Sequence, residues 1–155
     1  MRREFARWIC MATLISNSSD ETLGVGESWG RELNAGWLIG LVGELGAGKT
    51  ILAKGIARGL GIQSKVKSPT FCLVSIHEGG RLTLVHLDLY RLESSREIAG
   101  AGLEEYLEDR SGIVVVEWAD RWIRRPEAVG RATRWVRMEF LDASARRIIY
   151  EDFGT

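Results

Sequence analysis

The chain has 155 residues, of which 45% are hydrophobic, so it can bury a substantial core without disulfides and is too short to favour two domains. Its formal net charge is zero, and no run approaches the roughly 18 uninterrupted apolar residues of a membrane span. The two cysteines, Cys10 and Cys72, show neither a disulfide framework nor metal-ligand spacing, which favours a soluble protein of the reducing cytoplasm.

The segment before residue 12 has no regular pattern. It carries three arginines but lacks the apolar core of a signal peptide. We predict that residues 1–11 form a flexible extension, with Met1 or Met11 as the translation start, and that residues 12–155 form a single domain. Residues 12–16 are its first predicted strand.

A helix is predicted over residues 20–33. The serines directly before it can cap its N-terminus, and its candidate apolar face consists of Leu23, Trp29 and Leu33. The apolar run at residues 38–42 then predicts a buried strand.

The most specific motif is G-E-L-G-A-G-K-T at residues 43–50, which matches the phosphate-binding pattern G-x-x-x-x-G-K-[ST]. A strand precedes it, and a helical pattern over residues 51–61 follows it, as a P-loop requires. Its glycines let backbone N–H groups converge on phosphates. We expect Lys49 to reach the β- and γ-phosphates and Thr50 to ligate Mg²⁺. The nucleotide contacts predicted in this loop are Glu44, Leu45, Gly46, Ala47, Gly48, Lys49 and Thr50.

The loop over residues 65–70 is a candidate switch. Pro69 interrupts any regular pattern, and the hydroxyls of Ser68 and Thr70 could approach a metal ion or a γ-phosphate. The alternative is a plain surface turn at the X-Pro bond.

Residues 71–76 and 81–90 predict a β-hairpin, which would make the sheet mixed. Within it, Cys72 lies in an apolar run and is predicted to be a small buried side chain. His77 lies in the turn and is predicted to be exposed. His86 and Asp88 are two residues apart on one strand, so their side chains should share a face. His86 could face the site or be a satisfied core histidine.

The C-terminal half continues the alternation of strands and helices. Its predicted elements are a helix that starts at residues 94–97, a short helix over 103–109, a buried strand over 113–118, a helical turn within 119–125, and a hairpin of 133–141 with 146–151. The chain is therefore predicted to be an α/β protein with a three-layer, P-loop NTPase-like fold, a mixed parallel and antiparallel sheet, and a C-terminal hairpin.

Two carboxylates follow buried-looking strands. Asp88 ends one strand and Glu117 ends another, which is where a P-loop protein needs acids for a metal ion and an attacking water. Strand-end acids can also be caps or salt-bridge partners. With Lys49, these two acids are the predicted catalytic residues, and with Thr50 they are the predicted metal ligands.

Charge is unevenly distributed along the second half of the chain. Acidic residues dominate residues 93–120, and arginines dominate residues 121–147. The basic segment could contact a protein partner or a nucleic acid, or it could belong to solvated faces.

Five motifs together resemble the bacterial TsaE (YjeE) family in order and spacing. They are G-E-L-G-A-G-K-T (43–50), K-S-P-T-F (67–71), H-L-D-L-Y-R (86–91), G-L-E-E-Y-L (102–107) and V-E-W-A-D-R (116–121).

The resemblance implies a small Mg²⁺-dependent ATPase required for the threonylcarbamoyl modification of adenosine 37 in tRNAs that read codons starting with A. It implies that the protein does not transfer the group itself but binds and supports the TsaD–TsaB complex, so that its relation to tRNA would be indirect. It also implies that Asp88 is the acid of the metal site, that Glu117 and Trp118 lie beside the nucleotide, and that Thr70 belongs to a switch-like loop. We expect weak activity that partners stimulate, because no arginine finger is evident in the chain.

A small-metabolite kinase is the alternative function. In this hypothesis, Arg121, Arg124, Arg125 and Arg131 would form a lid over a phosphorylated acceptor. A GTPase is disfavoured because the chain has no [NT]-K-x-D motif for guanine.

Overall fold

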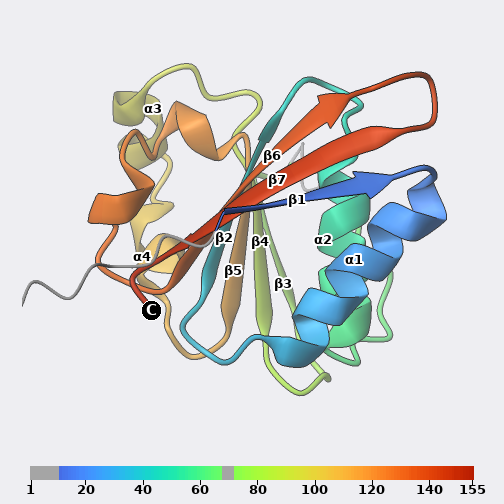
Figure 1. The fold of residues 1–155 in the computed structure, drawn as a ribbon. Coiled ribbons are helices and arrows are strands. Elements are labelled where there is room, and N and C mark those ends of the chain that lie inside the picture. Colours follow the sequence, from blue (N-terminus) through green and yellow to red (C-terminus); the bar gives the residue numbers. More distant parts are fainter. Residues whose placement is uncertain (1–10, 68–71) are drawn as a thin grey trace, which may run out of the picture.

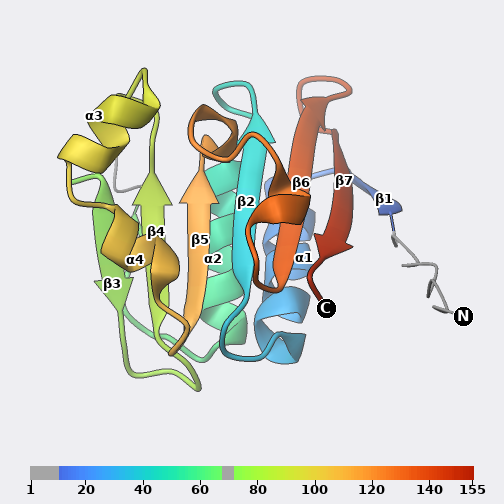
Figure 2. The same ribbon diagram turned by 90° about the vertical axis from the view of Figure 1, so that its left-hand side faces the viewer.

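The computed structural model describes residues 11–67 and 72–155. Within these residues one sheet of seven strands runs through the molecule, in the order β1-β7-β6-β2-β5-β4-β3 (Figures 1 and 2). The strands are β1 (Met11–Ser16), β2 (Leu38–Gly43), β3 (Val74–His77), β4 (Leu84–Asp88), β5 (Ile113–Glu117), β6 (Thr133–Phe140) and β7 (Arg146–Phe153).

The sheet is mixed, as predicted. Its centre is parallel, because β2 pairs with both β6 and β5, and β5 pairs with β4. The antiparallel pairs lie towards the edges and include the two predicted hairpins, β3–β4 and β6–β7, with β1 added to the outside of β7. The carboxyl ends of the parallel strands therefore meet at one edge of the sheet.

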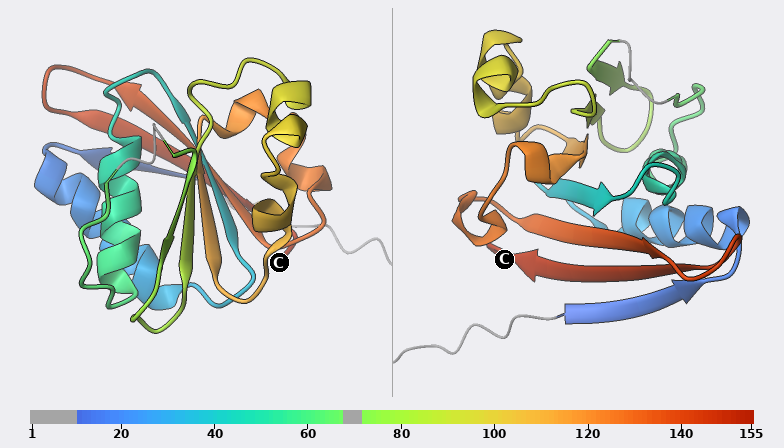
Figure 3. Two further views of the ribbon diagram at one scale, coloured as in Figure 1. Left: turned by 180° about the vertical axis from the view of Figure 1, so that it is seen from behind. Right: turned by 90° about the horizontal axis from the view of Figure 1, so that it is seen from above.

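Helices cover both faces of the sheet, which confirms the three-layer α/β architecture (Figure 3). One face carries α1 (Ser19–Glu32) and α2 (Lys49–Gly59). The other face carries α3 (Ser95–Gly100), α4 (Glu104–Glu108) and two 3₁₀ turns, η1 (Ala119–Arg121) and η2 (Pro126–Ala128). The apolar side chains form two cores accordingly, one on each face.

The alternation of side chains along β4 shows how the strands divide between these cores. Leu84 packs into the core under α1 and α2, whereas Val85 and Leu87 pack into the core on the other face. Because successive side chains point to opposite faces, His86 and Asp88 lie with Leu84 on the α2 side. The predicted common face of these two residues is confirmed.

Serine side chains begin two of the helices in the predicted manner. The Ser18 hydroxyl accepts a hydrogen bond from the N–H of Glu21 at 3.1 Å, and the Ser94 hydroxyl accepts one from the N–H of Glu97 at 3.2 Å. Each bond satisfies a backbone donor that has no partner within the helix.

Helices α1 and α2 contact each other through four glycines that the sequence analysis did not use. A Cβ atom on Gly26 or Gly30 of α1 would overlap backbone atoms of α2, and a Cβ atom on Gly55 or Gly59 of α2 would overlap backbone atoms of α1. The two backbones therefore touch directly. This packing fixes α1 against the helix that follows the P-loop.

Two local predictions were wrong. Cys72 is exposed and lies outside β3, which begins only at Val74. His77 is the last residue of β3 and is partly buried, with its Nε2 atom unpartnered. The predicted switch residues Ser68 and Thr70 lie outside the described residues.

No helix in the described ranges is both long enough and apolar enough to cross a membrane.

Candidate functional site

The P-loop connects the end of β2 to the start of α2. Three of its glycines have positive φ angles, of 155° at Gly43, 82° at Gly46 and 103° at Gly48, which side chains with a Cβ atom rarely adopt. A Cβ atom at Gly43 would also lie 2.5 Å from the carbonyl oxygen of Met138 on β6. The glycines are therefore required by the loop itself, which leads the chain directly into the N-terminus of α2.

Lys49 is buried at the first position of α2 and folds back over the loop. Its Nζ atom donates hydrogen bonds to the carbonyl oxygens of Gly43 (2.6 Å) and Glu44 (2.8 Å). The same atom lies 4.2 Å from the centroid of the Trp118 ring. Burial lowers the pKa of Lys49, an effect that the nearby carboxylates, first Glu117 and then Asp88, oppose.

A hydrogen-bonded chain joins the partly buried Thr50 to the buried side chains of Glu117 and His86. The Thr50 hydroxyl lies 2.9 Å from Oε1 and 3.1 Å from Oε2 of Glu117. The Nε2 atom of His86 lies 2.7 Å from Oε1 of the same carboxylate, and its Nδ1 atom has no hydrogen-bond partner. Glu117 is therefore held between the P-loop threonine and a buried histidine. His86 faces the site, as one of its two predicted readings required, but it is not a fully satisfied core histidine, because its Nδ1 atom lacks a partner.

Asp88 lies beside Glu117 because of the strand register. The two residues are paired at the ends of the parallel strands β4 and β5, and both are buried. Oδ1 of Asp88 accepts a hydrogen bond from the N–H of Tyr90 at 3.0 Å. Because β5 lies between β2 and β4, Glu117 is on the strand adjacent to the P-loop strand, and Asp88 is one strand further away.

Aromatic side chains form one wall of this site. The non-glycine residue Trp118 has a left-handed backbone with φ of 58°. Its ring lies 5.1 Å from the ring of Tyr90, and the guanidinium of Arg121 lies 5.1 Å from the Trp118 ring centroid. Sequence reasoning assigned no role in the leading hypothesis to Tyr90 or Arg121. Their position just after the strand-end acids, at the same sheet edge, is the signal that could have found them.

The predicted site residues are largely brought together. A pocket of about 270 Å³ is lined by Leu45, Gly46, Gly48, Lys49, Thr50, Ile51, Asp88, Tyr90, Glu117 and Trp118. Two predicted contact residues of the P-loop do not line the pocket. Glu44 has an exposed side chain and contacts Lys49 through its carbonyl oxygen, whereas the methyl group of Ala47 is buried in the core below the loop.

The proposed arginine lid does not form over this pocket. Arg131 is buried at the opposite end of the sheet, where it donates to the carbonyl oxygens of Gly36 and Leu107, both at 2.8 Å. Arg124 and Arg125 line a separate pocket together with Arg131. Of these four arginines only Arg121 lies beside the P-loop site, over the Trp118 ring, so the lid hypothesis is wrong in this arrangement.

The basic C-terminal segment does not form a single surface either. Arg131 bonds to backbone carbonyls, and Arg134 forms a largely buried ion pair with Asp152 at 2.7 Å. Several of its arginines therefore stabilise the fold.

The sequence of the chain is similar to those of known proteins. The family model described as "Threonylcarbamoyl adenosine biosynthesis protein TsaE" matches residues 16–148. The chain is 42% identical over 119 residues to the tRNA threonylcarbamoyladenosine biosynthesis protein TsaE of Nostoc sp., covering 75% of this chain and 73% of that protein. It is 43% identical over 107 residues to the Treponema pallidum protein of the same name, covering 69% and 78%.

The fold is also similar to a solved structure. The crystal structure of Bacillus subtilis YdiB superposes with a TM-score of 0.74 at 26% sequence identity, and the match covers 94% of this chain and 88% of that one. The resemblance found in the sequence motifs is confirmed by these comparisons.

Proposed function

The chain belongs to the TsaE family, and we propose that it binds and hydrolyses Mg²⁺–ATP in support of tRNA threonylcarbamoyladenosine biosynthesis. The observation that carries this proposal is the contact between the Thr50 hydroxyl and the Glu117 carboxylate at the start of α2. A P-loop hydroxyl beside a strand-end carboxylate is the arrangement that P-loop NTPases use to hold Mg²⁺.

The donors present fit Mg²⁺. This ion prefers oxygen ligands and is usually bound by one or two carboxylates together with substrate phosphates and water. Thr50 and Glu117 would ligate it directly, and Asp88, one strand further from the P-loop, would hold a ligating or attacking water. Held by these residues, Mg²⁺ would supply positive charge that neutralises the phosphates.

Lys49 would act on the phosphates themselves. Its ammonium group now satisfies the carbonyl oxygens of Gly43 and Glu44, in the concavity of the loop. Phosphate oxygens are stronger acceptors, so the ammonium group would turn to them when a nucleotide binds. Trp118 and Tyr90 would form the apolar wall against which the nucleotide packs.

Hydrolysis by the isolated chain should be slow. Arg121 stacks on Trp118 and donates to the carbonyl oxygen of Leu92 at 3.0 Å. Arg146 donates to the carbonyl oxygen of Gly46 at 3.4 Å and lies over the Phe140 ring. Both arginines therefore have partners other than a phosphate. We propose that the TsaD–TsaB complex completes the site in the cytoplasm, where tRNA is modified.

A phosphate-release assay with and without the TsaD–TsaB complex tests this function. We expect slow release of free phosphate by the chain alone and faster release with the complex. Lys49→Ala should lower the stimulated rate by about 100-fold, because it removes a charged donor to the phosphates. Arg96→Ala, on the exposed surface of α3, should leave the rate unchanged. Phosphate transfer to a small acceptor, or rapid hydrolysis without partners, would contradict the proposal.

A further inference from the structure

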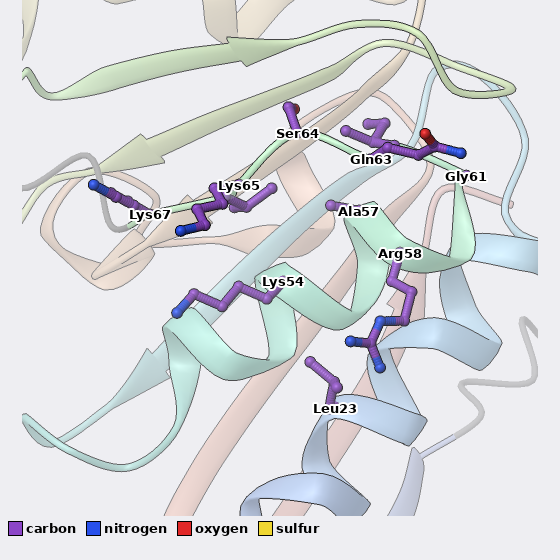
Figure 4. Close-up of a pocket in the computed structure, with 11 residues that line it drawn as sticks. Leu23, Lys54, Ala57, Arg58, Gly61, Gln63, Ser64, Lys65 and Lys67 are labelled. Atoms are coloured by element: carbon purple, nitrogen blue, oxygen red, sulfur yellow. The ribbon is translucent and has the colours of Figure 1, made fainter.

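A second and larger pocket lies on the outer side of α2, away from the P-loop site. It has a volume of about 790 Å³ and lies between Leu23 of α1, the exposed side of α2, and the segment 61–67. Four cationic residues line it, and we call this surface the basic groove: Lys54, Arg58, Lys65 and Lys67. In Figure 4, the side chains of Lys54, Lys65 and Lys67 extend towards the same side of the pocket, whereas Arg58 extends towards Leu23.

The four cations have no acidic partners within the described parts of the chain. No acidic residue lines the groove, and none of the ion pairs found there involves these side chains. All four residues are exposed. Lys54 and Arg58 are four residues apart on α2, a spacing at which like charges destabilise a helix. The charges of this cluster therefore have no ion-pair partner among the described residues, which points to an anionic ligand.

The composition of the groove separates the possible anionic ligands. Interfaces between proteins are depleted in lysine and serine and enriched in aromatic residues, methionine and arginine. The basic groove has three lysines, Ser64 and Gln63, and no aromatic residue. Of its apolar members, Ala57, Ile62 and Val66 are buried, and Leu23 is partly exposed. This lining is a poor surface for an acidic protein segment.

The same lining suits phosphate groups. Lysine binds phosphate as a point charge, and serine hydroxyls and glutamine amides commonly donate to phosphate and sugar oxygens of nucleic acids. The absence of aromatic side chains from the lining leaves no platform for stacking bases. We propose that the basic groove binds the phosphate backbone of RNA, without reading its sequence.

This inference goes beyond the proposed function, which requires only the nucleotide pocket. The groove shares α2 with that pocket, because α2 begins with Lys49 and carries Lys54 and Arg58 on its exposed side. RNA bound in the groove would thus lie against the helix whose first turn holds the nucleotide. The two proposals remain separable, since ATP hydrolysis and RNA binding are measured independently.

The test is a fluorescence anisotropy titration of a labelled, unmodified tRNA transcript with the full chain, over about 50 to 200 mM salt. Four phosphate contacts predict a slope of log K against log[salt] of roughly −3 to −4. Lys54→Glu combined with Arg58→Glu should weaken binding about tenfold or more and reduce the magnitude of the slope by about 2. The matched control is Arg96→Glu with Arg124→Glu, two exposed arginines outside the groove, which should bind as the wild type does.

The outcomes separate RNA from other anions. Rates of phosphate release at saturating ATP should be equal in the wild type and both double variants, which shows that the variants are folded. A random-sequence RNA of equal length should compete as well as the tRNA does, whereas polyglutamate of equal charge should compete poorly. The inference would be overturned if the Lys54→Glu, Arg58→Glu variant bound tRNA as tightly as the wild type does. It would also be overturned if polyglutamate competed better than RNA of equal charge.

Discussion

The carboxylate of Glu117 is fixed from two directions. The Thr50 hydroxyl contacts both of its oxygens, and His86 contacts one of them at 2.7 Å from the core side. A carboxylate that is held in this way is already oriented when a metal ion arrives, so little side-chain entropy remains to be lost on binding. We regard His86 as the residue that positions Glu117.

Glu117→Gln tests the role of this charge. The amide has nearly the same size, so the melting temperature should change little, but it lacks the negative charge that a Mg²⁺ ligand supplies. Partner-stimulated phosphate release should fall about 100-fold, and the Mg²⁺ concentration for half-maximal release should rise. Glu139→Gln is the matched control, because Glu139 pairs with Arg147 on the C-terminal hairpin. An unchanged rate in Glu117→Gln would remove this residue from the metal site.

At the residue scale, sequence patterns predict the P-loop residues well because the motif is local. Lys49 and Thr50 lie within one contiguous pattern, and so do the glycines around them. Thr50 and Glu117, in contrast, are 67 positions apart, and their contact depends on which strand lies next to β2. The order of the strands is not encoded in any single segment. The sequence therefore could not decide between Asp88 and Glu117 as the acid nearest to the threonine.

At the scale of the elements, the contact between α1 and α2 depends on glycines. Glycine destabilises an isolated helix, so neither helix is favoured by its composition alone. The backbone contact at Gly26, Gly30, Gly55 and Gly59 compensates by bringing the two helices close together. The helical spacing of apolar residues predicts both helices. The role of the glycines depends on how the two helices pack, which neither segment shows alone.

Gly55→Ala should therefore destabilise the protein. The added methyl group would overlap the backbone of α1, and overpacking of this kind costs about 1–3 kcal/mol, or roughly 3–10 °C in melting temperature for a chain of this size. Gly24→Ala in α1 is the control, because its Cβ atom would meet nothing within 4 Å. That variant should be stabilised by about 0.5–1 kcal/mol through helix propensity. Thermal unfolding followed by circular dichroism measures both, and equal melting temperatures would contradict the close packing.

The β3–β4 hairpin adds a pH dependence to stability. Burial, and next the neighbouring His86, lower the pKa of His77 from its ordinary value of 6.5. The unfolded chain then binds a proton at His77 more readily than the folded chain does. The free energy of unfolding therefore has its full contribution from neutral His77 above pH 6.5 and loses it as the pH falls through the lowered pKa. His77→Gln should lose less thermal stability than the wild type between neutral and mildly acidic pH. Parallel losses in the two proteins would exclude this role.

At the scale of the whole molecule, the parallel centre of the sheet assembles the site. The strands β2, β4 and β5 all end at the same edge, where they present the P-loop, Asp88 and Glu117. The remaining strands, β1, β3, β6 and β7, extend the sheet on both sides. None of their residues lines the P-loop pocket. The fold class and most of the elements could be predicted, because alternating strands and helices around a P-loop allow few topologies.

The most direct test of the central claim is calorimetric titration of the full chain with ATP in the presence of Mg²⁺. If the P-loop, Thr50 and Glu117 form one nucleotide site, the wild type should bind ATP at one site per chain, Lys49→Ala should bind far more weakly, and removal of Mg²⁺ should weaken binding by the wild type. No detectable binding by the wild type, or equal binding by Lys49→Ala, would contradict the account.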